Sequence, residues 1–116
     1  NYNLGGLYLE KGLVTDALRH FQLASRIEPE IPEPFAKLGE ISLSQKNFKL
    51  ADSYFKRAVE LNPRSSKVFK NLGVVNFYHL NRPKQGLAYF TRSLNLDPGQ
   101  PEADKIRELL AQSKPG

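Results

Sequence analysis

The sequence predicts an all-α protein, a solenoid of about seven helices stacked in pairs, and three observations support this fold class. Residues recur at a fixed period of 34 positions, apolar residues within each copy are spaced three or four apart, and prolines separate the copies. The short spacing is that of an amphipathic helix, and the long period indicates units that bury their apolar faces on one another. The recurring residues of the first copy are Leu4, Gly5, Ala17, Phe21, Ala24 and Pro29, which match Leu38, Gly39, Ala51, Phe55, Ala58 and Pro63.

A third copy follows, with one residue inserted between its two halves. In its first half Phe69, Leu72 and Gly73 lie 34 positions after Phe35, Leu38 and Gly39. In its second half Gly86, Phe90, Ser93 and Pro98 lie 35 positions after their counterparts. We expect the turn at Asn81–Pro83 to hold the inserted residue.

The first copy is expected to form helices over residues 2–11 and 15–28. Thr15 is a suitable N-cap for the second of these helices, because its hydroxyl can accept a hydrogen bond from an exposed amide. Gly5 and Gly6 lie inside the first helix, where a glycine costs about 1 kcal/mol relative to alanine. We therefore assign them to close packing of a neighbouring helix.

The second copy begins after the proline-rich segment 29–34, which cannot continue a helix. Proline is tolerated in a first helical turn, so the next helix should begin near Pro32 and reach Leu43. Asn47 is expected to cap the following helix, which Asn62-Pro63 ends.

The third copy starts with a helix capped by Ser65 or Ser66 and continues with a helix over about 83–96. After residue 101 the Leu-Gly pair does not return, and the apolar positions of 102–113 alternate with charged ones. The last helix of a solenoid must show water a polar face, so this segment is expected to be a capping helix.

The order of an aromatic residue, Leu-Gly, Ala, Phe, Ala and Pro resembles the tetratricopeptide repeat family. In the middle copy these residues are Phe35, Leu38-Gly39, Ala51, Phe55, Ala58 and Pro63. The resemblance implies a right-handed superhelical solenoid of antiparallel helix pairs, the α-α superhelix. It divides a single domain, 1–116, into repeat one at about 1–31, repeat two at about 32–65, repeat three at about 66–100 and a capping helix at about 101–113. The family's second aromatic position holds Tyr8 in the first copy, but Ser42 and Asn76 in the others.

Composition limits the class of protein further. The chain has 116 residues, of which 40% are hydrophobic and 25% charged, as in an ordinary globular domain. It holds no apolar run of 18 residues, so we expect no membrane insertion. Because it opens inside a repeat, we expect a fragment of a longer protein. It has no cysteine, which excludes disulfides and leaves the compartment open, with the cytoplasm favoured over the periplasm.

We find no catalytic constellation and expect neither an enzyme nor a bound metal or cofactor. His20 and His79 lie on different copies without the spacing that would place two ligands on one helical face. The carboxylates at 28–33 lack an apolar surround that would raise their pKa. The recurring phenylalanines at 21, 55 and 90 are assigned to the core.

The resemblance implies that the first helix of each copy lines a concave face that binds peptides. Its inward positions hold Tyr2, Gly6, Leu9, Glu33, Ala36, Glu40, Leu43, Lys67, Lys70, Asn71, Val74, Phe77 and Tyr78. Some family members grip the C-terminal acid of a heat-shock chaperone with a carboxylate clamp. Of that clamp the third copy keeps Lys67 and has Asn71 in place of a basic residue, while Tyr2 and Gly6 occupy the first-copy positions, so we disfavour this ligand.

The function expected is that of a protein–protein interaction module, a scaffold or adaptor that binds a peptide or helix of a partner. Two alternatives stay open: a recruiting or regulatory arm of a larger enzyme, and weak nucleic-acid binding through repeat three. Six basic residues and no acidic one lie between Glu60 and Asp97, so an acidic partner segment is expected there. The abrupt start also raises self-association through the N-terminal end.

Overall fold

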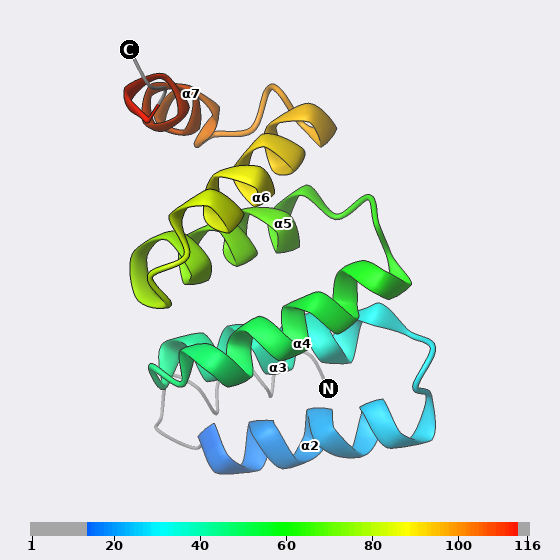
Figure 1. The fold of residues 1–116 in the computed structure, drawn as a ribbon. Helices are drawn as coiled ribbons and strands as arrows, with labels where there is room; N and C mark the ends of the chain where they lie inside the picture. Colours follow the sequence, from blue (N-terminus) through cyan, green and yellow to red (C-terminus); the bar gives the residue numbers. More distant parts are fainter. Residues whose placement is uncertain (1–13, 114–116) are drawn as a thin grey trace.

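A computed structural model describes residues 14–113, and this part of the chain is folded into helices joined by short turns (Figure 1). A five-residue π-helix, η1 (Val75–His79), directly follows the α-helix that ends at Val74. The predicted first helix, 2–11, lies outside the described residues. The α-helices are α2 (Val14–Ile27), α3 (Pro32–Ser44), α4 (Phe48–Leu61), α5 (Ser66–Val74), α6 (Pro83–Leu96) and α7 (Ala103–Gln112).

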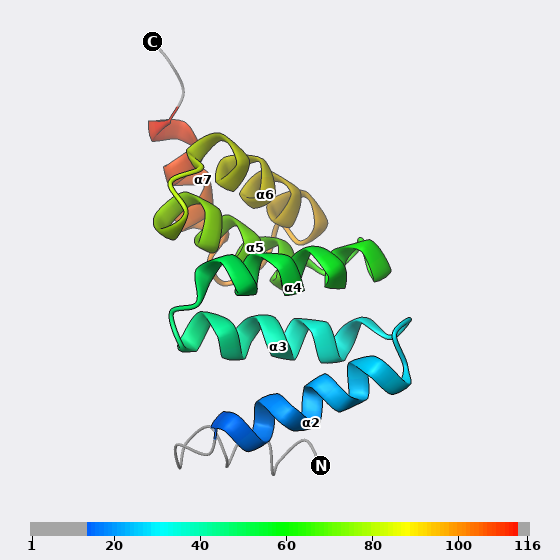
Figure 2. The same cartoon turned by 60° about the horizontal axis from the view of Figure 1, so that its bottom comes forward.

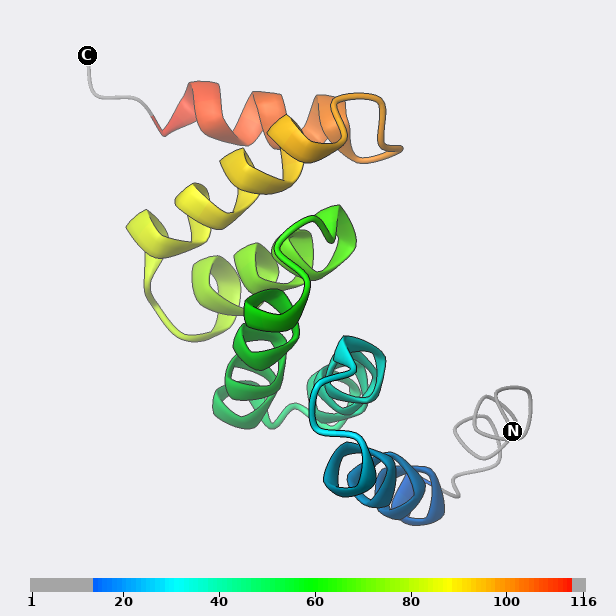
Figure 3. The same ribbon diagram turned by 90° about the vertical axis from the view of Figure 1, so that its right-hand side faces the viewer.

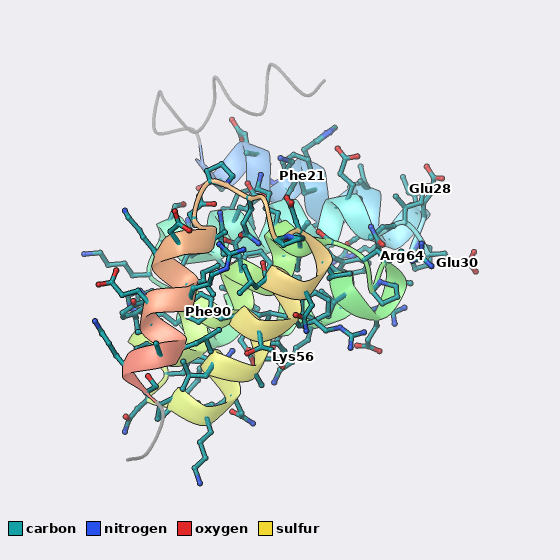
Figure 4. The ribbon with its side chains drawn as sticks, turned by 90° about the horizontal axis from the view of Figure 1, so that it is seen from above. Phe21, Glu28, Glu30, Lys56, Arg64 and Phe90 are labelled. Atoms are coloured by element: carbon teal, nitrogen blue, oxygen red, sulfur yellow. The ribbon has the colours of Figure 1, made fainter. Side chains whose placement is uncertain are left out.

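The helices follow one another along a single axis, so the predicted all-α solenoid is confirmed. Antiparallel pairs α3–α4 and α5–α6 stack between α2 at one end and α7 at the other (Figures 2 and 3). The molecule is elongated, measuring 48 × 26 × 23 Å along its principal axes. Figure 4 shows Glu28, Glu30 and Arg64 at the end of the molecule where the turns between pairs lie.

The helix boundaries fully confirm one of the three predicted caps, the one at Ser65. Prolines occupy the first turns of α3 and α6, and the Ser65 hydroxyl accepts a hydrogen bond from the Val68 amide at 3.3 Å. Asn47 is the N-cap residue of α4, but within the described chain its side chain makes no capping hydrogen bond. The prediction for Thr15 is wrong, because α2 already includes Val14 and Thr15 therefore lies in its first turn.

The core runs through the middle of the stack. Phe55, Leu38 and Leu72 are fully buried. One phenylalanine of each helix pair, Phe55 or Phe90, lies against a glycine of the facing helix. A Cβ built on Gly39 would lie 2.5 Å from Cε1 of Phe55, closer than real Cβ contacts come. The small residues therefore let the two helices of a pair approach closely.

The inserted residue of the third copy lies in η1, so its predicted place in the turn at Asn81–Pro83 is wrong. The turns after α3 and after η1 each contain one residue with a positive φ, Lys46 at 63° and Asn81 at 54°. These two residues are 35 positions apart, whereas the helix starts at Pro32 and Ser66 are 34 apart. The extra residue therefore widens the helix itself, where the Leu80 amide donates to the Val75 carbonyl five residues earlier at 2.9 Å.

Candidate functional site

The predicted binding residues within the described chain come from α3 and from the rod formed by α5 and η1. Tyr2, Gly6 and Leu9 lie outside the described residues. Of the remaining ten residues, five line two hollows, one between α3 and α5 and the other between the α5–η1 rod and α7. Glu40, Leu43, Lys67, Asn71 and Phe77 line neither of these hollows.

The first hollow lies near the start of α3 and α5 and has a volume of about 260 Å³. Two of the predicted residues, Glu33 and Ala36, line it. Glu33 is exposed and is the charged residue of its rim. The full lining is Pro32, Glu33, Ala36, Ala58, Asn62, Ser65 and Val68.

The second hollow lies further along the same rod, has a volume of about 140 Å³ and takes one wall from α7. Lys70, Val74 and Tyr78 of the α5–η1 rod line the other wall. Tyr78 keeps 60% of its surface exposed. The rest of the lining is Phe90, Glu102, Lys105, Ile106 and Leu109.

Both predicted lysines of this face are held by acids from neighbouring helices. Lys67 Nζ lies 3.8 Å from Glu40 Oε2 on α3, and Lys70 Nζ lies 3.1 Å from Glu102 Oε1, next to α7. The hydrogen bond and the positive charge of Lys70 lower the pKa of Glu102 below its usual range. Repeat three is therefore less basic in space than along the sequence, which weakens the case for nucleic-acid binding.

Three of the predicted residues lie deeper than expected. Phe77 is half-buried and packs on α6. A Cβ built on Gly86 of α6 would lie 2.6 Å from the Cβ of Phe77. Leu43 packs against the core cluster, and Asn71 is half-buried on α5. Their contribution to binding stays a prediction.

The junction before α7 differs from the equivalent junctions of the two preceding repeats. A further hollow of about 240 Å³ lies beside α2. Its residues Ala24, Glu28 and Ile31 are 34 positions before Ala58, Asn62 and Ser65 of the first hollow. Its full lining is His20, Phe21, Ala24, Glu28, Ile31, Glu33 and Pro34. The counterpart of Ser65 35 positions later is Gln100, which is buried. Gln100 Nε2 donates to the Ser66 hydroxyl and to the Ser93 carbonyl, both at 3.1 Å. Its side chain occupies the place that stays open in the preceding repeats.

A buried polar cluster that the repeat pattern does not indicate joins repeats two and three. Asn76 Nδ2 in η1 donates a hydrogen bond to Oδ1 of Asp52 in α4 at 2.9 Å. The same carboxylate lies 2.9 Å from Lys56 Nζ and 3.6 Å from an Arg82 nitrogen. The substitution of Asn for the family's aromatic residue was the signal that could have indicated it.

A second missed feature is a repeated cation–π contact between the helices of each pair. The Arg57 guanidinium lies 5.7 Å from the ring centre of Phe35, and that of Arg92 lies 5.5 Å from the ring centre of Phe69. The two pairs occupy equivalent positions of successive repeats. They show that the aromatic residue opening each copy also serves as a packing surface for an arginine.

Within residues 14–113 no group of three or more potential ligands is placed to hold a metal ion. None of the helices described is long and apolar enough to cross a membrane.

Comparison with known proteins identifies the repeat. A family model described as the tetratricopeptide repeat matches residues 32–65. Among curated proteins, the chain is 35% identical over 98 residues to a UDP-N-acetylglucosamine–peptide N-acetylglucosaminyltransferase of Giardia intestinalis. It is 25% identical to the type IV pilus assembly protein PilF of Pseudomonas aeruginosa. These matches cover 84% and 96% of this chain, but only 6% and 58% of those proteins.

Solved structures share the fold at lower identity. The first tetratricopeptide domain of Spaghetti (RPAP3), bound to an HSP90 peptide, superposes with a TM-score of 0.82 at 22% identity, covering 95% of this chain and 87% of that one. The Yersinia enterocolitica secretion chaperone SycD, in complex with a peptide of YopD, gives 0.83 at 14% identity, covering 96% and 87%. At these identities the likeness concerns the fold alone.

Proposed function

The chain is a member of the tetratricopeptide repeat family, and from that premise we propose that it is a protein–protein interaction module. It acts as a scaffold or adaptor and holds a peptide or helix of a partner on the face formed by α3, the α5–η1 rod and α7. The observation that carries the proposal is the pair of hollows along this face, which together offer room for side chains of a bound segment. Two structural neighbours of the fold are bound to peptides, which supports the same function here.

Selection of random peptides displayed on phage against the whole chain tests this function without a known partner. The selected peptides are then titrated calorimetrically against variants on and off the face. Glu33→Arg and Tyr78→Ala change the rims of the two hollows, and we expect at least one of them to weaken binding about tenfold or more, equivalent to about 1.4 kcal/mol. Ser53→Arg adds a positive charge on the exposed side of α4 and should leave affinity unchanged.

Two outcomes would contradict the proposal. Failure to select any peptide above background would argue against peptide binding by this chain. Equal affinity of the wild type, Glu33→Arg and Tyr78→Ala for every selected peptide would place the binding surface elsewhere.

We also propose, as a second candidate, that the chain is a recruiting or regulatory arm of a larger enzyme. It is favoured by the identity of 35% to a glycosyltransferase of which the match covers 6%. The full-length sequence of the protein tests it, because a catalytic domain outside the repeats is expected. A full-length protein made of repeats throughout would contradict this candidate and leave the interaction module intact.

A further inference from the structure

We propose that the second hollow, between the α5–η1 rod and α7, is an anchor site for one apolar side chain of the partner with a carboxylate beside it. The inference rests on the proposed function and adds the chemistry of the bound segment. It depends on three features of this chain: the size of the hollow, the place that η1 gives to Tyr78, and the charges on the rim.

The size and lining of the hollow fit a single side chain. Its volume is about 140 Å³, and apolar cavities of about 150 Å³ admit a benzene-sized group. Val74 and Leu109 lie on facing walls, Ile106 and Phe90 are buried beneath, and the exposed ring of Tyr78 stands at one end. A branched aliphatic or aromatic side chain would cover this surface and exclude water from it.

The π-helix determines which side chain stands at the end of the hollow. Asn76 and Phe77 are consecutive, yet Asn76 bonds to α4 while Phe77 packs against α6. The wider turn accommodates both inward side chains, and Tyr78 then follows Lys70 and Val74 on the outer wall. Repeat two lacks the insertion, and its residue 34 positions before Tyr78 is Ser44. The aromatic end wall is therefore particular to this junction.

The rim charges favour an acid next to the anchoring side chain. Lys70 and Lys105 line the hollow together with a single acid, Glu102. Glu102 Oε1 already lies 3.1 Å from Lys70 Nζ. The Glu102 side chain is 44% exposed, however, so it can rotate away from Lys70 into the solvent. An incoming carboxylate can pair with Lys105 and can replace Glu102 at Lys70, forming charge-assisted hydrogen bonds. The first hollow, with Glu33 on its rim, would repel the same group.

The test compares peptides selected on the wild-type chain with analogues in which the acid next to the apolar anchor is changed to its amide. We expect the Glu→Gln analogue to bind about fivefold to tenfold more weakly at low salt, and the difference to shrink as salt is added. Glu102→Gln removes the competing acid and should tighten binding of the acidic peptide severalfold. Lys105→Glu should weaken the acidic peptide and spare its amide analogue, and Lys84→Glu, an equal charge change on the exposed start of α6, should affect neither.

The result separates this inference from the proposed function. Peptides that bind and respond to Glu33→Arg, but show no difference between acid and amide or between Lys105→Glu and Lys84→Glu, would overturn the anchor site and leave the interaction module standing. Tighter binding by Tyr78→Ala would also overturn it. Absence of any selected peptide would remove both.

Discussion

Gly39 and Gly73 set the distance between the two helices of each pair. A Cβ on Gly73 would lie 2.6 Å from Cδ1 of Phe90, and the ring is buried and cannot move away cheaply. We expect Gly73→Ala to lower the free energy of unfolding by about 1–3 kcal/mol, although alanine is the better helix former. Urea denaturation followed by far-UV circular dichroism measures the change.

Gly99 supplies the matched control for this substitution. A Cβ there would meet nothing closer than Asp97 Oδ1 at 3.9 Å. Gly99→Ala should therefore change stability by no more than about 0.5 kcal/mol. Equal stabilities of the two variants would show that Phe90 does not hold the contact described.

Asn76 and Ser42 occupy equivalent positions of successive repeats, but only Asn76 is expected to lower the stability when its polar group is removed. Asn76 bonds to the carboxylate of Asp52, which is only 5% exposed, and Asn76→Leu leaves that carboxylate without its amide donor. We expect a loss of about 1–3 kcal/mol. Leu18 stands where Asp52 would be in the preceding repeat, and the Ser42 hydroxyl has no hydrogen-bond partner in residues 14–113.

Ser42→Ala should accordingly leave the stability within about 0.5 kcal/mol of the wild type in the same urea titration. The double variant Asp52→Leu/Asn76→Leu should recover most of what Asn76→Leu loses, because a buried polar pair replaced as a whole costs little. A double variant less stable than Asn76→Leu alone would contradict this account.

At the scale of the element, the capping helix α7 depends on a polar residue that precedes it. Gln100 Nε2 lies within hydrogen-bonding distance of the Ser66 hydroxyl and of the Ser93 and Asp97 carbonyls, and its two N–H groups are shared among them. One side chain therefore ties the turn before α7 to both α5 and α6. Gln100→Ala is expected to destabilise α7 locally by about 1–3 kcal/mol. Hydrogen exchange measured by mass spectrometry should show faster exchange across Ala103–Gln112, with α3 and α4 unaffected.

Gln112→Ala is the control for this prediction, because Gln112 is exposed on the same helix. It should leave exchange across α7 unchanged. A Gln100→Ala protein whose α7 exchanges at the wild-type rate would show that apolar packing of Ala103 and Ile106 suffices to hold the cap.

The sequence predicted the existence and order of the helices because their signals are local. Pro32, Ser65 and Pro83 act on the backbone within one turn, and the repeat period extends those signals over the chain. The inserted residue was misplaced because a loop usually absorbs an insertion. The positive φ at Lys46 and Asn81 and the hydrogen bond from Leu80 to Val75 show that the helix absorbs it here. Phe77 of this wider turn packs against α6, a tertiary contact that the local sequence pattern does not indicate.

At the scale of the whole molecule, the candidate site could be predicted only in part because charges of neighbouring repeats meet in space. The segment between Glu60 and Asp97 holds no acid in sequence, yet Lys67 pairs with Glu40, Lys70 with Glu102 and Arg82 with Asp52. Periodicity places Tyr78 and Lys70 on one face, but it cannot show which residue of the next element lies opposite. The partners of a repeat come from its neighbours on both sides.

The stacked architecture also predicts a gradient of stability along the chain, because each repeat contacts only the repeats next to it. Phe55 and Leu72 are fully buried in the middle of the stack, whereas α7 has one side covered by the stack and the other exposed to water. We expect amides of α4 and α5 to exchange more slowly than those of α7.

Leu72→Ala, at a cost of about 2–5 kcal/mol, should speed exchange in α4, α5 and α6 together. Leu110→Ala, at a half-buried position of the cap, should speed exchange in α7 alone. If Leu110→Ala instead accelerates all helices equally, the stack unfolds as a single unit and the gradient does not exist.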